Sequence, residues 1–231
     1  MLTALSWFVI EPGKGLFLDR IWLFVKMKLT AILLDGGFLT KKLEKLLGHF
    51  PTSADVRSFA SKCCKQDEEL FRVYYYDSPP YDGEAIHPIT KANHSFAKTA
   101  VFGRNSRLQR ELRLSDAFAV RKGEVKFGGW KIKPASIKQI VKTGRGIVDT
   151  DFIPDIQQKG VDMRIGLDVA WLSANRIVQR IILVTGDSDF IPAMKFARRE
   201  GIQVVYVSMN HTSIKEGLIE HCDEHRTVIF P

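Results

Sequence analysis

The sequence has few cysteines and no motif that would use them. Cys63, Cys64 and Cys222 are odd in number and include an adjacent pair, which does not suit a disulfide framework. No CxxC spacing is present for a zinc site. We therefore expect three free thiols packed as small hydrophobic residues. A reducing, cytoplasmic location fits this composition best.

Long apolar runs are also missing. Residues 2–10 and 16–25 are apolar but interrupted by charged residues, and neither approaches the roughly 20 residues of a membrane span. The order of a secretory signal (basic start, apolar centre, small-residue cleavage site) is absent. Met27 precedes a clean strand pattern, so we interpret residues 1–26 as an overlong start. The domain is placed at residues 27–231.

Composition points to an α/β enzyme-sized domain with a mild basic excess. The 231 residues are 45% hydrophobic and 26% charged, enough for a substantial core. The formal net charge of +8 gives weak support for a polyanionic partner. The most basic part is the middle of the chain, where we expect an insertion around residues 77–157.

Strand and helix patterns alternate along the chain. Short apolar runs predict buried strands at Leu29–Leu34, Leu70–Tyr76, Ile181–Thr185 and Gln203–Val207. Amphipathic spacing predicts helices over residues 39–47, 54–64, 96–114, 161–174, 190–199 and 213–219. Residues 77–92 are expected to be a loop, and residues 118–130 a hairpin that turns at Lys122-Gly123. Strands alternating with helices of this length favour a parallel sheet.

Acidic residues follow two of these apolar strands. Asp35 comes directly after the first strand, and Asp187 and Asp189 follow the strand that ends at Thr185. The carboxyl ends of parallel strands form the functional edge of an open sheet, so these three side chains should emerge together. Gathered carboxylates need a hard cation, and oxygen ligands suit Mg²⁺ or Mn²⁺ rather than zinc.

Two further aspartates lie on the helix over residues 161–174. Asp162 is in its first turn, where the helix dipole stabilises an anion, so it is either a metal ligand or an ordinary helix-start acid. Asp168 lies closer to the core. It is either an outer contact of the metal site or a buried, hydrogen-bonded acid, and the sequence leaves that choice open.

Four segments together resemble the NYN domains of bacterial LabA-like proteins, relatives of PIN nucleases: LLDGGFL, YYYDSPPYDG, QKGVDMRIGLDVAWL and LVTGDSDFIPAMKFARREGIQVV. The likeness runs in order from Met27 to about Asp223. It implies a three-layer, PIN-like (Rossmannoid) α/β fold with a central parallel sheet, a divalent metal and endoribonuclease activity. The family's acidic positions match Asp35, Asp162, Asp187 and Asp189, with Asp168 matching a further one.

One residue departs from the family pattern. Many members carry Asn three residues after the first aspartate, whereas this chain has Phe38. A polar contact near the scissile phosphate is therefore missing or supplied by another residue.

We expect single-stranded RNA as the partner. Lys159 could approach phosphate oxygens, and Arg104 and Arg107 lie three residues apart on one predicted helix flank. Each of these also fits an ordinary solvated position. Tyr74–Tyr76 or Trp130 could stack on bases, although such aromatics are more often core. Homo-oligomerisation is left open.

Two other functions compete with a nuclease. A haloacid-dehalogenase-like phosphatase also places Asp after its first strand, but it needs a second Asp two residues later, where this chain has Gly37. A non-catalytic RNA-binding or regulatory module could keep the same fold and metal site. Metal-dependent RNA cleavage separates these alternatives.

Overall fold

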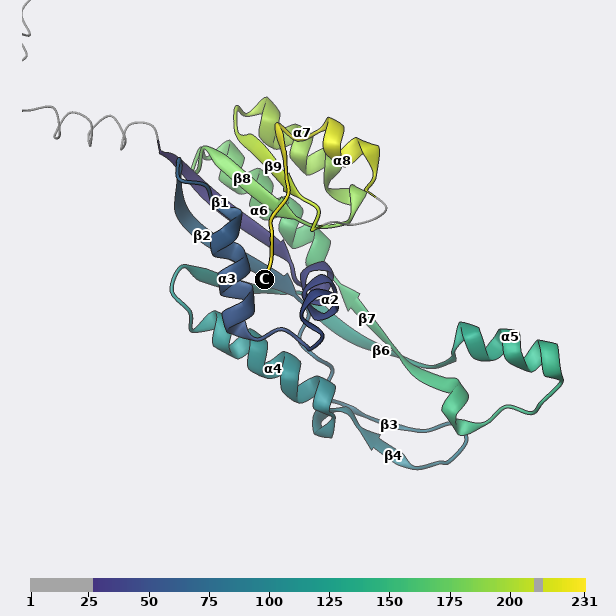
Figure 1. Cartoon of the computed structure of the whole chain (residues 1–231). Coiled ribbons are helices and arrows are strands. Elements are labelled where there is room, and N and C mark those ends of the chain that lie inside the picture. The colour runs from purple at the N-terminus through teal and green to yellow at the C-terminus, as the bar shows by residue number, and fades with distance from the viewer. Residues whose placement is uncertain (1–26, 210–213) are drawn as a thin grey trace, which may run out of the picture.

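A six-stranded parallel sheet forms the centre of the molecule (Figure 1). The computed structural model describes residues 27–209 and 214–231, so the prediction for residues 1–26 lies outside it. The strand order is β10-β9-β8-β1-β2-β5, with every neighbouring pair parallel. The strands are β1 (Lys28–Asp35), β2 (Glu68–Asp77), β5 (Phe118–Lys122), β8 (Arg180–Val184), β9 (Gln203–Val207) and β10 (Glu224–Arg226). The predicted parallel sheet is confirmed.

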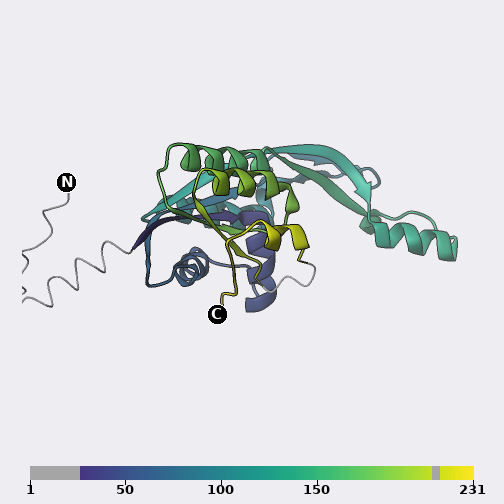
Figure 2. The same cartoon turned by 90° about the horizontal axis from the view of Figure 1, so that it is seen from above.

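Helices cover both faces of this sheet, which gives three layers. One face is covered by α2 (Gly36–Leu47), α3 (Ser53–Cys63) and α4 (Ala100–Arg113), and the other by α6 (Val161–Ala174), α7 (Ile191–Arg199) and the short α8 (Glu216–Glu220). Figure 2 shows the green α6 and α7 on one side of the sheet and the purple and blue α2 and α3 on the other.

Alternation along β1 divides the core between the two faces. Ile32 and Leu34 pack with the α2, α3 and α4 side, while Ala31 and Leu33 pack with the α6 and α7 side. All four are fully buried, as expected for a central strand whose successive side chains point to opposite faces. The continuous apolar run at residues 29–34 is thus explained by burial on both sides.

Side-chain caps fix where the covering helices begin. Thr52 and Asp55 form a reciprocal capping box at the start of α3. The hydroxyl of Thr99 accepts the Phe102 N–H, so α4 begins at Ala100 rather than at the predicted Phe96. Residues 96–98 instead form the 3₁₀ turn η1 (Phe96–Lys98).

The predicted hairpin over residues 118–130 is wrong. β5 pairs in parallel with β2, with Val73 opposite Phe118, and extends the main sheet. The next strand, β6 (Glu124–Ile132), leaves the sheet and pairs antiparallel with β7 (Phe152–Lys159). Gly123 is needed where the chain changes sheet, because a Cβ there would lie 2.6 Å from the Lys159 carbonyl oxygen.

Strands β6 and β7 form a two-stranded ribbon that projects from the body, and we call residues 124–159 the arm. The helix α5 (Pro134–Thr143) lies at its far end, followed by the 3₁₀ turn η2 (Asp149–Asp151) (Figures 1 and 2). A short hairpin, β3 (Glu84–Ile86) with β4 (Asn93–Ser95), lies within the predicted loop at residues 77–92 and beyond it.

Three features complete the fold. Cys63 is buried and all three cysteines are free thiols, as the sequence predicted. Glu68 is buried between Arg180 and Arg226, so the starts of β2 and β8 are joined to β10 by ion pairs. Within the described residues, no helix is both long enough and apolar enough to span a membrane.

Candidate active site

Asp35 ends β1 and begins α2, and its carboxylate is held by both neighbouring elements. Oδ1 accepts the Phe38 N–H at 3.1 Å, which makes Asp35 the N-cap of α2. Oδ2 accepts the Thr185 hydroxyl at 3.0 Å, and that hydroxyl in turn accepts the Asp187 N–H at 3.1 Å. Thr185 follows β8, the parallel neighbour of β1, so one buried side chain joins the two strand ends.

The turn after Asp35 requires glycine because of close packing. A Cβ on Gly36 would lie 2.6 Å from the Tyr76 carbonyl oxygen and 2.7 Å from the ring of Tyr75. Both tyrosines are fully buried in β2. The absence of a side chain at Gly36 therefore lets α2 begin directly against the adjacent strand and sets the direction of the Asp35 carboxylate.

Asp187 and Asp189 lie in the turn after β8, which ends in the 3₁₀ helix η3 (Ser188–Phe190). Asp187 caps this turn by accepting the Asp189 N–H at 3.0 Å. Asp162 comes from a third element, the first turn of α6, and is exposed. The four aspartates thus reach this edge of the sheet from β1, the β8–α7 turn and α6.

The charge of each of the other three carboxylates acts on Asp162, and we call these four aspartates the acid cluster. Burial raises the pKa of Asp35, and the negative charge of Asp187 raises it further. Partial desolvation raises the pKa of Asp162, and the charges of Asp35, Asp187 and Asp189 all add to this shift. The cluster is therefore a region in which carboxylates repel one another.

Asp168 is engaged in contacts of its own. Its Oδ2 accepts the Tyr76 hydroxyl at 2.8 Å and the Arg121 Nε–H at 3.0 Å. These contacts join α6 to β2 and β5, which gives Asp168 the hydrogen-bonded arrangement that the sequence left as one of two alternatives. Its assignment as a metal ligand stays a prediction.

The donor set of the acid cluster fits a hard divalent cation, in an open rather than a closed arrangement. Throughout residues 27–209 and 214–231, no group of three or more His, Cys, Asp or Glu side chains is arranged so that it could hold a metal ion. Mg²⁺ usually keeps several waters and takes one or two carboxylates from a protein, so a closed cage is not required. Thr185 contacts the Asp35 carboxylate and the Asp187 backbone N–H, which makes Asp35 and Asp187 the candidate pair for such an ion.

Sequence reasoning missed Asp77, which ends β2 beside β1. It is 7% exposed, and its carboxylate accepts the side-chain amides of Gln109 at 3.1 Å and Gln158 at 3.3 Å. Burial raises the pKa of Asp77, and the charge of Asp35 contributes, which places the two carboxyls near each other. The rule that selected Asp35 could have found it, because Asp77 also follows an apolar strand at the same edge.

The predicted substrate contacts are spread over the surface. Lys159 is exposed at the end of β7, three residues before Asp162. Arg104 lies over the ring of Phe50 at 4.4 Å and pairs with Glu44 at 3.5 Å, on the α2 side of α4. Arg107 is exposed on the same helix.

The aromatic residues considered as base contacts lie in two different environments. Tyr74–Tyr76 are at most 2% exposed, so the suggestion that they stack on bases is wrong and they belong to the core. Trp130 instead belongs to an aromatic cluster outside the main sheet, in which it contacts His87 at 4.8 Å and Phe127 at 6.1 Å between ring centroids.

Comparison with known proteins identifies the family. The family model of the NYN domain matches residues 82–229. The chain belongs to the NYN domain family. NYN domains are part of the PIN-like nuclease superfamily and are usually nucleases with an RNA-related function. The match includes Asp162, Asp187 and Asp189 and leaves Asp35 outside it, while the LabA-like branch stays a resemblance.

A solved structure from Vibrio parahaemolyticus RIMD 2210633, titled as a protein of unknown function, is similar to this NYN protein. The alignment covers 88% of this chain and 94% of that chain, with 16% sequence identity and a TM-score of 0.49. No curated protein matches the chain.

Proposed function

We propose that this NYN protein is a Mg²⁺- or Mn²⁺-dependent ribonuclease that cuts single-stranded RNA endonucleolytically. The observation that carries the proposal is the acid cluster at the functional edge of a parallel sheet, where the charges of neighbouring carboxylates help to raise the pKa of Asp35 and of Asp162. Membership of a family of nucleases agrees with it.

The residues of the chain have separate roles in this proposal. Asp35 and Asp187 hold the cation, and Thr185 fixes both of them through one hydroxyl. Asp162 and Asp189, both exposed, meet the ion directly or through water. When bound, the ion supplies an activated water and positive charge for the phosphorane oxygens.

Phe38 occupies the position at which many family members carry Asn. Its ring packs against the core on the α2 side, so the position that is Asn in many relatives offers no polar side chain here. A Cβ on Gly37 would lie 3.6 Å from Asp35 Oδ1 and 3.9 Å from Gln158 Oε1, which places the Gln158 amide beside the acid cluster. Lys159, the next residue along β7, is the candidate phosphate contact instead.

The test compares the wild type with Asp35→Asn and Asp187→Asn on end-labelled single-stranded RNA, with Mg²⁺, Mn²⁺ or EDTA. We expect internal cuts by the wild type only with metal, and a rate loss of more than about 100-fold in both variants. Asp116→Asn, an exposed aspartate outside the site, is the matched control. Equal cleavage by all four proteins would contradict the proposal, and metal-independent RNA binding without cleavage would favour a regulatory module.

A further inference from the structure

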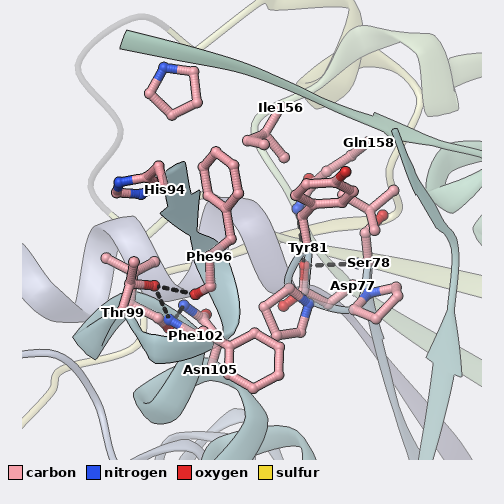
Figure 3. A pocket seen from close by; sticks show the side chains of 15 residues that line it. Asp77, Ser78, Tyr81, His94, Phe96, Thr99, Phe102, Asn105, Ile156 and Gln158 are labelled. Carbon is pink, nitrogen blue, oxygen red and sulfur yellow. Dashed lines mark hydrogen bonds between the residues drawn. The ribbon is translucent and has the colours of Figure 1, made fainter. Parts of the chain in front are cut away.

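A cavity of about 410 Å³ opens beside the acid cluster, between the sheet edge and the root of the arm (Figure 3). Its walls come from the segment after β2, from β4 and α4, and from β6 and β7. The volume falls within the roughly 300–1,000 Å³ of pockets that bind small organic groups. None of the site residues predicted from sequence lines it.

Asp77 and Gln158 connect this cavity to the acid cluster. Both line it, and the Gln158 amide donates to Asp77 at 3.3 Å. The other end of the same amide is the oxygen that lies near Gly37 and Asp35. A group inside the cavity is therefore separated from the acid cluster by one side chain.

The walls suit a flat aromatic ring. The rings of Tyr81, Phe96 and Phe102 and the prolines Pro79 and Pro80 supply apolar faces. Tyr81 and Phe96 are held at 5.2 Å between ring centroids, so the aromatic surface is already ordered before a ligand enters. Figure 3 shows Tyr81 and Phe96 next to each other with Ile156 beside them, and Phe102 in another part of the wall.

Polar side chains also line the cavity, among them Asp77, His94 and Asn105. Asn105 and Gln158 line the cavity with amides that can both donate and accept hydrogen bonds, which is what the edge of a nucleobase requires. A fatty or steroid-like ligand would not need these amides or the neighbouring carboxyl of Asp77.

A second, basic cavity shares a wall with the first. It has a volume of about 290 Å³ and is also lined by Pro79, Pro80 and Phe102, which separate the two. Its other lining residues include Arg110, Arg113 and Lys122. Three cations next to an aromatic cavity can form ion pairs with the phosphates on either side of a bound base.

We propose that the aromatic cavity receives one unpaired nucleobase of an RNA strand, while the neighbouring phosphates lie along the basic cavity. This inference rests on the proposed ribonuclease function for the nature of the strand. In this proposal the insertion around residues 77–157 determines where the RNA enters the acid cluster. Arg110 and Arg113, rather than Arg104, are then the phosphate contacts of α4.

The experiment uses full-length Asp187→Asn protein in EDTA, so that binding is measured whether or not the wild type cleaves RNA. Single-stranded RNA 12-mers with one abasic position, moved stepwise along the strand, are titrated by fluorescence anisotropy. We expect one position at which loss of the base weakens binding roughly 5- to 150-fold, the range of one base stacked on aromatic side chains.

Ile156→Trp fills the cavity, and Ile219→Trp is the matched control at a similarly exposed isoleucine on α8. In the filled variant the abasic effect should disappear, and the intact 12-mer should bind as weakly as the abasic one. The control should behave like its parent. Circular dichroism confirms that both variants fold.

Free nucleoside monophosphates separate the two sources of a base. Weak competition by mononucleotides that Ile156→Trp abolishes supports a base site, and a position-dependent abasic effect shows that a strand supplies the base. A flat abasic scan, together with unchanged binding by Ile156→Trp, would overturn the inference and leave the ribonuclease proposal intact. If the abasic scan depends on position but the wild type does not cleave RNA, the ribonuclease proposal is overturned and the base site stands.

Discussion

Thr185 is the residue on which the geometry of the acid cluster depends most directly. Its hydroxyl donates to Asp35 and accepts from the Asp187 N–H, and the side chain is fully buried. Replacing it by Val keeps the shape but leaves two partly buried polar groups without this partner. Each such group costs about 1–3 kcal/mol unless it finds another partner.

We therefore expect Thr185→Val to slow RNA cleavage roughly 10- to 100-fold, mainly in kcat, because the carboxylates lose their fixed orientation. Thr185→Ser keeps the hydroxyl and should retain most of the activity. Steady-state kinetics on one RNA substrate and thermal melting of all three proteins provide the measurement. Equal activity of the Val and Ser variants would show that the hydroxyl has no role in positioning.

At the residue scale, sequence reasoning selected acids that follow an isolated apolar strand and did not select Asp77. Asp35 and Asp187 stand alone after their strands, whereas Asp77 is followed by Ser78, Pro79 and Pro80, a pattern that also indicates an ordinary turn. Its burial depends on Gln109 and Gln158, which lie 32 and 81 residues further along the chain. No local pattern in the sequence reports such contacts.

At the element scale, the start of α2 is the tightest junction in the site. Gly36→Ala would place a methyl group against the backbone of Tyr76 and the ring of Tyr75, neither of which is free to move. We expect a loss of about 1–3 kcal/mol in the free energy of unfolding, together with lower activity.

Gly103→Ala is the matched control, since it also lies in a helix, α4, and a Cβ there meets nothing within 4 Å. It should stabilise the protein by about 0.5–1 kcal/mol, because alanine is the better helix former. Urea denaturation followed by circular dichroism measures both changes. A Gly36→Ala protein as stable as the wild type would mean that α2 can shift away from β2 at little cost.

Ion pairs at the starts of β2, β8 and β10 predict acid sensitivity. Hydrogen bonds from Arg226 lower the pKa of Glu224 to about 2. For Glu68, burial acts to raise the pKa, but hydrogen bonds from Arg226 and Arg180 leave it lowered. A carboxyl whose pKa is lower in the folded state contributes stability above its ordinary pKa near 4.5, and that contribution is lost as the pH falls through the folded value.

Glu224→Gln should therefore be less stable than the wild type at pH 7, by up to about 1 kcal/mol because Glu224 is partly exposed. The difference should shrink below pH 4.5 and vanish only below about pH 2. Urea denaturation at a series of pH values measures it. A difference independent of pH would mean that the substitution acts through packing rather than charge.

The elements of the sheet were predictable from sequence to different extents. β1, β8 and β9 are continuous apolar runs, and burial on both faces leaves no other arrangement for them. β5 and β6 were misread as a hairpin because Lys122-Gly123 looks like a turn. β5 pairs with β2, which is separated from it in the sequence by α4, and β6 pairs with the later strand β7. Neither pairing leaves a signal in the local sequence.

At the scale of the whole molecule, the arm carries basic residues away from the body. Lys131 pairs with Asp155, Lys133 donates to the Thr150 carbonyl and Arg145 pairs with Asp151, all within the arm. Lys138 and Lys142 are exposed on α5 at its far end. This places two cations where a strand extending from the acid cluster could meet them.

Lys138→Gln combined with Lys142→Gln should weaken RNA binding without affecting the thermal midpoint of the body. If both cations contact phosphates, the slope of log affinity against log salt should become shallower by about 1.4, from about 0.7 for each cation on a single strand. Lys41→Gln with Lys45→Gln on α2 is the matched control. Identical salt slopes for the two double variants would mean that RNA does not reach α5.

The central position of β1 has a consequence for how the protein is made. One of its neighbours, β2, follows about 40 residues later, but the other, β8, is about 150 residues away, with Leu34 opposite Val184. Pairings so distant form slowly, and a ribosome completes β1 long before β8 exists. Asp35 consequently meets Asp187 only after most of the chain has been synthesised, so a nascent chain that ends before Asp187 cannot assemble the acid cluster.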